Sequence, residues 1–192
     1  MRNNPEYIEV DGKKYKINTS FKVALKCNSL FKDDTIKDYE KLCAIIYMLF
    51  GEDALKDRKN YDKLFELAIR YLTLDDIKED DRNDRDVDMD YDQDYNLIKA
   101  SFKSDFDIDL NKEDLHWWDF FNYLNGLSEN CILNRVRTIR TYDLSEINSE
   151  KEKKKIKDAK RRFKLKEKEP ELTDKQRESA DKFYKLTGIK RR

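Results

Sequence analysis

The chain has 192 residues, of which 38% are hydrophobic and 43% are charged, whereas a typical soluble domain has roughly 45–50% apolar and about 25% charged residues. This length accommodates one domain of ordinary size with a tail, and the apolar content is enough for a modest core. Lys and Arg number 41, and so do Asp and Glu, so the net charge does not indicate a nucleic acid or an acidic molecule as partner.

The N-terminal part predicts a β-hairpin followed by three helices. Asp11 and Gly12 lie between two short runs of alternating character, which is a strong hairpin signal because a type I′ turn needs positive φ at both central positions. Apolar residues then recur at helical spacing in three stretches, the last of them near residues 61–72. Thr35 is the expected N-cap of the second helix, and Gly51 is its expected left-handed C-cap.

An acidic segment follows these helices. Residues 75–94 hold eleven acidic residues and only three basic ones. We expect residues 75–90 to form an acidic linker or loop within the domain, because they contain too few apolar groups to pack. The alternating acids up to Asp94 resemble a calcium-binding loop, but with Asp84 first the sixth position is Met89 and the twelfth is Tyr95, where an EF-hand needs Gly and Glu. A solvated acidic loop is therefore favoured over a cation site.

Two helices with aromatic faces are predicted next. The first carries an apolar stripe from Tyr91 to Phe106, and the second carries one from Trp117 to Leu127, with Asn111 as its expected N-cap. Trp117 and Trp118 are adjacent, so they cannot both face one core. We expect one of them to be at least partly exposed and to contact a partner.

The last part of the chain is strongly basic. A helix with Ser128 as N-cap is expected to turn Ile132 inward, and residues 151–168 then hold eleven basic residues against three acidic ones. The apolar stripe of this basic helix is thin, and a further short helix is expected from Thr173. The sequence therefore predicts a mainly α protein, with a compact helical domain and short N-terminal β-hairpin in residues 1–145 and extended charged C-terminal helices in residues 146–192.

No arrangement of reactive side chains stands out. His116 is the only histidine, and neither a second histidine nor a paired thiol accompanies it, so we expect a packed ring rather than a zinc ligand or a catalytic base. Cys27, Cys43 and Cys131 are odd in number and show no metal-ligand spacing, which predicts reduced thiols of the core. Phosphate-binding and common hydrolase motifs are lacking. We expect a non-enzymatic protein without cofactor or metal.

Membrane insertion and secretion are not expected either. The longest apolar run, residues 42–50, has less than half of the roughly 20 residues that a membrane-spanning helix needs. The first residues contain no apolar region of the kind found in signal peptides.

Two kinds of protein contact are predicted instead. In the first, aromatic and apolar residues dock on a partner while nearby Lys and Arg steer the approach. In the second, the acidic segment and the basic helix pair as a charge latch, within one chain or between the chains of a homo-oligomer. The basic helix could also follow a phosphate backbone, but a charged run is more often a solvated helix face. The expected partner-binding residues are Trp117, Trp118, Ile156, Ala159, Phe163, Phe183 and Tyr184, and the expected latch residues are Asp84, Asp86, Asp88, Lys153, Lys154, Lys155, Arg161 and Arg162.

Three motifs in order give the chain a resemblance to a known family. They are Tyr91-Asp92-Gln93-Asp94-Tyr95 with Ile98, Ser101 and Phe102; then Leu115-His116-Trp117-Trp118 with Phe120 and Leu124; and then Val136, Ile139 and Arg140. On these residues the chain resembles the "gene product fifteen" family of tailed bacteriophages and prophages of Gram-positive hosts. The resemblance extends over nearly the whole chain.

The resemblance implies a role in tail assembly. Genes of the family lie in the tail-morphogenesis region, typically ahead of the tape-measure gene, which implies a chaperone that binds the tape-measure protein and/or the tail-tube protein. Such a chaperone would act in the cytoplasm of the bacterial host and be absent from the mature virion. No catalytic residues come with the resemblance. A structural virion component, such as a head–tail connector or tail-completion protein, and a nucleic-acid-binding module remain as alternatives.

Overall fold

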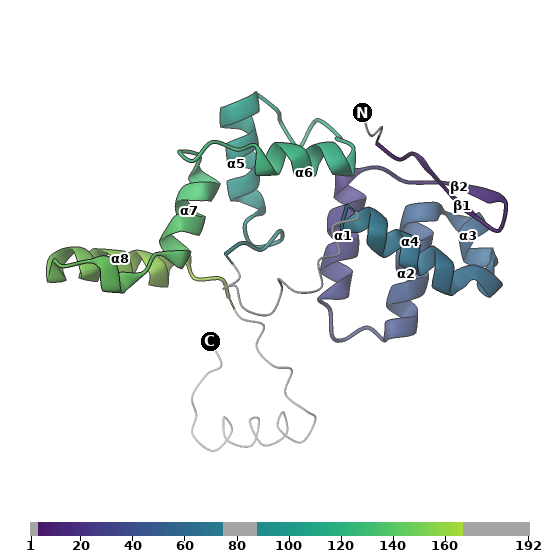
Figure 1. Ribbon diagram of the computed structural model, residues 1–192, viewed down its shortest axis with the longest axis horizontal. Coiled ribbons are helices and arrows are strands. Elements are labelled where there is room, and N and C mark those ends of the chain that lie inside the picture. The colour runs from purple at the N-terminus through teal and green to yellow at the C-terminus, as the bar shows by residue number, and fades with distance from the viewer. Residues whose placement is uncertain (1–3, 75–87, 167–192) are drawn as a thin grey trace, which may run out of the picture.

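The computed structural model describes residues 4–74 and 88–166, and most of its elements are helices (Figure 1). This confirms the prediction of a mainly α chain that opens with a β-hairpin. Phe183, Tyr184 and the helix expected from Thr173 lie outside the described residues. In chain order the elements are β1 (Tyr7–Val10), β2 (Lys13–Lys16), α1 (Phe21–Phe31), α2 (Asp38–Phe50), α3 (Glu52–Lys56), η1 (Arg58–Asn60), α4 (Tyr61–Leu72), α5 (Tyr95–Phe106), α6 (Trp117–Asn125), α7 (Ile132–Thr141), η2 (Leu144–Glu146) and α8 (Glu150–Phe163), where η denotes a 3-10 helix.

The hairpin forms where the turn signal predicted it. β1 and β2 are antiparallel, and the turn residues Asp11 and Gly12 have φ values of +50° and +79°. Both values lie in the left-handed region that a two-residue hairpin turn requires. One face of the hairpin buries Val10 and Tyr15, and β1 packs against α4.

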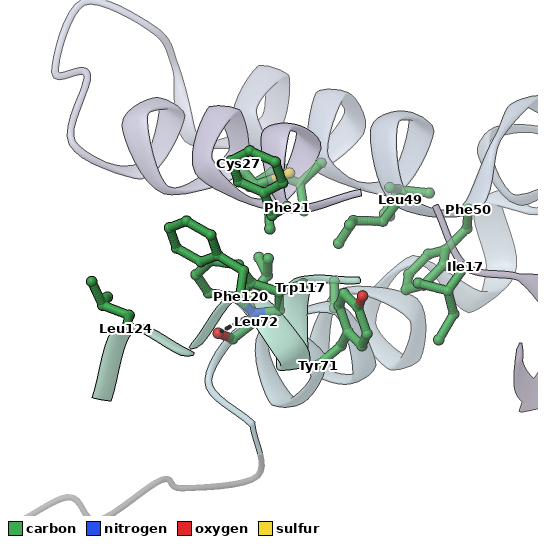
Figure 2. Close-up of a cluster of buried hydrophobic side chains, with 14 of the residues drawn as sticks. Ile17, Phe21, Cys27, Leu49, Phe50, Tyr71, Leu72, Trp117, Phe120 and Leu124 are labelled. Atoms are coloured by element: carbon green, nitrogen blue, oxygen red, sulfur yellow. Dashed lines mark hydrogen bonds between the residues drawn. The ribbon is translucent and has the colours of Figure 1, made fainter. Parts of the chain in front are cut away.

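The core joins both parts of the described chain. Helix α2 packs on both α1 and α4, and α6 closes the core by packing on α1 (Figure 1). The Phe120 ring stacks on Phe21 at a centroid distance of 4.8 Å and on Phe102 at 5.1 Å. The rings of Phe21, Phe120 and Trp117 lie together between the helices (Figure 2). Stacked rings bury large apolar areas, so α6 is a main source of cohesion between the segments before and after the acidic residues.

The start of α6 differs from the prediction. The helix begins at Trp117, not near Asn111, and His116 is its N-cap. The reason is a contact with a distant part of the chain, because His116 forms a β-bridge with Ser20. The Phe21 N–H donates to the Leu115 carbonyl at 2.9 Å and the Trp117 N–H donates to the Thr19 carbonyl at 2.7 Å, which holds the chain extended up to residue 116.

Two further helix starts were predicted wrongly. Thr35 does not cap α2, which begins at Asp38, because its hydroxyl group bonds to Asp33 instead. Ser128 does not cap α7, whose N-cap is Cys131 with its sulfur accepting from the Asn134 N–H. Because α7 starts later than predicted, Ile132 points outward, with 38% of its surface exposed, and Leu133 lies in the core.

All three cysteines are free, as predicted. Cys27 and Cys131 are buried, and Cys43 is partly exposed. Among residues 4–74 and 88–166, no helix is both long and apolar enough to cross a membrane.

Two buried tyrosines provide a matched test of the core. The Tyr71 hydroxyl is buried without a hydrogen-bond partner among the described residues, and its burial raises the pKa of this group. The Tyr61 hydroxyl instead donates to the Leu55 carbonyl. We predict that Tyr71→Phe raises the free energy of unfolding by up to about 1 kcal/mol, since it removes an unsatisfied polar group, and that Tyr61→Phe lowers it by about 1 kcal/mol. Urea denaturation measures both. A clear loss of stability in Tyr71→Phe would contradict the assignment.

Candidate functional site

Residues 88–94, here called the acidic loop, bind the end of α1. The Asp90 carboxylate accepts from the Lys32 ammonium group at 2.7 Å, and the Asp92 carboxylate accepts from the Ser29 hydroxyl at 2.7 Å. Asp90 also accepts from the backbone N–H groups of Asp92 and Gln93. These bonds fix both the backbone of the loop and its position on α1, so this part of the acidic segment is not a solvated linker.

The other side of the acidic loop binds α7. Asp88 pairs with Arg137 at 2.8 Å, and Asp94 accepts two hydrogen bonds from Arg140, at 2.7 and 2.8 Å. Only 10% of the Arg140 side chain and 3% of the Asp94 side chain are exposed. A charge pair this deeply buried is stable only if its remaining hydrogen-bonding groups are satisfied. They are, because Arg140 also donates to the Asp88 carbonyl and Asp94 accepts from the Asp90 N–H.

The same residues hold the end of α8. Arg140 donates from Nε to the carbonyl of Phe163 at 2.7 Å. The side-chain amide of Gln93 makes two bonds to Lys166, since its nitrogen donates to the Lys166 carbonyl at 3.0 Å and its oxygen accepts from the Lys166 N–H at 2.8 Å. We call Gln93 and Arg140 the socket, and residues 150–166 the C-terminal arm. The socket contacts only backbone atoms of the arm in these bonds.

Hydrogen-bond donors around Asp90 affect the pKa of its carboxyl group. Burial alone would raise the pKa of Asp90, but the hydrogen bond from Lys32 and the backbone N–H groups of Gln93 and Asp92 outweigh this effect. The pKa of Asp90 therefore lies below its usual value, and the ionised form stabilises the folded chain.

Both tryptophans bind the end of α4. The indole N–H of Trp117 donates to the Leu72 carbonyl at 3.1 Å (Figure 2), and that of Trp118 donates to the Tyr71 carbonyl at 3.1 Å. Carbonyl groups in the last turn of a helix have no partner within the helix. Trp117 is 1% exposed, whereas Trp118 is partly exposed and stacks on the Tyr71 ring. The structure thus places Trp117 within the core and leaves part of Trp118 at the surface.

His116 has a structural position. Its Nδ1 accepts from the Trp118 N–H at 3.1 Å and so caps α6, while its Nε2 lies 3.2 Å from the Pro5 carbonyl, to which it donates. Both ring nitrogens are thus engaged in fixing the backbone around α6. In the parts of the chain that the structure covers, no cluster of three or more His, Cys, Asp or Glu side chains is arranged to hold a metal ion.

The predicted contact residues of the basic helix lie on α8. Ile156, Ala159 and Phe163 form a partly buried stripe along this helix, which packs on α7. Arg161 pairs with Asp158 of the same helix at 3.3 Å. Lys154, Lys155, Arg161 and Arg162 are exposed and Lys153 is partly exposed, while Asp84 and Asp86 lie outside the described residues. Of the three acidic residues predicted to form the charge latch, Asp88 pairs with Arg137 of α7. A latch to the basic helix stays a prediction for Asp84 and Asp86.

Sequence reasoning missed the roles of Gln93, Arg137 and Arg140. Two signals were present, since Arg137 and Arg140 are three residues apart on one helical face, and an acidic run precedes them in the chain. The motifs behind the family resemblance also contain Gln93, Asp94 and Arg140. What sequence alone did not reveal is that these residues meet.

Comparison with known proteins assigns the chain to a family. Residues 3–165 match the sequence model of the family described as bacteriophage Gp15 protein, and this range includes the acidic loop, α7 and α8. The chain therefore belongs to the bacteriophage Gp15 family, as the motifs indicated. Membership suggests a phage protein of virion structure or morphogenesis. Among curated proteins and solved structures, no relative matches the chain.

The buried pair of Asp94 and Arg140 is open to a direct test. We predict that Arg140→Ala lowers the free energy of unfolding by about 3–5 kcal/mol, because it leaves the Asp94 charge buried without its partner. Arg140→Lys should recover little of this loss, since an ammonium group cannot donate two parallel bonds to a carboxylate. Arg161→Ala, which removes an exposed pair, is the control and should leave stability nearly unchanged. Equal losses for Arg140→Ala and Arg161→Ala in urea denaturation would contradict the assignment.

The lowered pKa of Asp90 predicts that the stability of the folded chain depends on pH. A carboxyl group whose pKa is lowered by folding stabilises the protein above its unfolded pKa of about 3.9, and this contribution is lost as the pH falls through the folded value. Asp90→Asn keeps a side-chain oxygen for the loop backbone but loses the ion pair with Lys32. We therefore expect this variant to be less stable than the wild type at pH 7, by no more than about 1 kcal/mol. The difference should shrink as the pH falls below the unfolded pKa, and a difference that stays constant on acidification would contradict the ion-pair explanation.

Proposed function

We propose that this protein is a non-enzymatic tail-assembly protein, a chaperone that binds the tape-measure protein and/or the tail-tube protein while the phage tail is built. It would act in the cytoplasm of the bacterial host and leave before the virion is complete. Membership of the bacteriophage Gp15 family supports the phage context. The single structural observation that carries the proposal is the position and surface of α8.

Helix α8 has the features of a docking element. It lies at one end of the molecule, beyond α7 and away from α1 to α4 (Figure 1). It has 14 residues, none of them buried, and its last turn holds Lys160, Arg161 and Arg162. Its apolar stripe is partly exposed. A helix of this kind can lay its apolar face on a partner helix while its positive charges speed the encounter.

A narrow stripe also suits reversible binding. A tape-measure protein forms long helices that associate through apolar seams, and these seams must be covered before tube subunits assemble around them. The stripe of α8 consists of Ile156, Ala159 and Phe163, so it buries little apolar area in a complex. Weak apolar contact combined with electrostatic attraction gives fast binding and fast release, which a chaperone needs.

Co-purification with the tape-measure protein of the same phage tests the proposal. We predict that Ile156→Asp and Phe163→Asp each reduce the amount of bound tape-measure protein about tenfold or more, because a carboxylate would be buried in an apolar contact. Lys157→Ala is the matched control, since it changes the charge by the same one unit on the exposed face of α8. Binding by all three variants at the wild-type level would contradict a role for the stripe.

Analysis of purified phage particles separates the chaperone from a virion component. A chaperone is absent from the particles, or present in traces that vary between preparations. A fixed number of copies in each particle would refute the chaperone and indicate a structural component of the tail or of the head–tail junction.

A further inference from the structure

The socket binds the C-terminal arm through backbone N–H and carbonyl groups of the arm. Every copy of this chain presents the same groups. Gln93 binds the N–H and the carbonyl of Lys166, and Arg140 binds the carbonyl of Phe163. None of these bonds involves a side-chain atom of the arm, so they depend on the backbone of the arm and not on its side chains. The acidic loop beside the socket also attracts the positive charge of the arm, whichever copy the arm belongs to.

The arm is separate from the core. The buried residues of the core cluster run from Val10 to Leu133, and α8 contributes none. Within the described residues, the arm is held by its packing on α7 and η2 and by the bonds to the socket. Detaching the arm therefore breaks no contact within this core cluster. It uncovers the surfaces of α7 and α8 that pack on each other.

The connection between α7 and α8 can serve as a hinge. Residues 142–149 link the two helices and contain only the short 3-10 helix η2. A stretch of eight residues reaches roughly 25 Å when extended, which is enough to carry the arm away from its own socket. A change in the backbone conformation of residues 142–149 does not alter the bonds of Phe163 and Lys166 to a socket, because these bonds lie at the opposite end of the arm.

We propose that the arm is exchangeable, so that two copies of this protein form a dimer in which each arm occupies the socket of the other copy. The bonds of Gln93 and Arg140 are the same in the closed monomer and in the exchanged dimer, so exchange loses no socket contact. The arrangement has twofold symmetry and leaves no socket empty, so it stops at two copies. This inference does not depend on the proposed function, because it concerns the protein alone.

Isotope mixing tests the exchange on the full chain. Equal amounts of ¹⁴N-labelled and ¹⁵N-labelled protein are mixed at high concentration, and the dimer is isolated by size-exclusion chromatography with light scattering. A zero-length carbodiimide then joins carboxylates of the acidic loop to nearby lysines of the arm, and mass spectrometry reads the labels of each linked peptide pair. Exchange predicts pairs that carry one label of each kind. A protein that is monomeric at every concentration, or a dimer without mixed-label loop–arm pairs, would overturn the proposal.

The rate of mixing provides the second readout. Because monomer and dimer make the same socket contacts, Gln93→Ala should speed up the formation of mixed-label dimers about tenfold or more, while the dimer fraction stays close to that of the wild type. The control is Asn96→Ala, which changes an exposed residue in the first turn of α5. This variant should form mixed-label dimers at the wild-type rate. Mixing at the same rate in both variants would show that Gln93 does not hold the arm and would overturn the proposed socket.

Discussion

The buried pair of Arg140 and Asp94 is the constraint on which the second half of this structure depends. Asp94 lies at the start of α5 and Arg140 lies near the end of α7, so the pair fixes these helices against each other. The guanidinium group of Arg140 also donates to the Asp88 carbonyl of the acidic loop and to the Phe163 carbonyl at the end of α8. One side chain of α7 thereby contacts the start of α5, the acidic loop and the end of α8.

A second connection joins the two described parts of the chain. The β-bridge between Ser20 and His116 holds the entry to α6 against the start of α1, and the two indole groups bond to the end of α4. The acidic loop makes a similar polar connection at the other end of α1, where Asp90 binds Lys32 and Asp92 binds Ser29. The protein is thus built as two sets of helices that are joined by specific polar bonds as well as by the aromatic core.

The sequence predicted local features better than distant contacts. The hairpin turn at Asp11 and the span of α4 were correct, because turn chemistry and helical periodicity are encoded within a few residues. The starts of α6 and α7 were wrong because they depend on residues far away or on an unusual cap by a cysteine sulfur. The acidic loop was taken as solvated for the same reason, since its basic partners lie more than 40 positions away in the chain.

The placement of Trp117 and Trp118 gives this protein a natural spectroscopic reporter. They are the only two tryptophans of the chain, and both lie at the junction between α4 and α6. The emission of an indole ring responds to its hydrogen bonding and to the polarity around it. Intrinsic fluorescence therefore reports whether the segments before and after the acidic stretch are joined, and it does so without any attached dye.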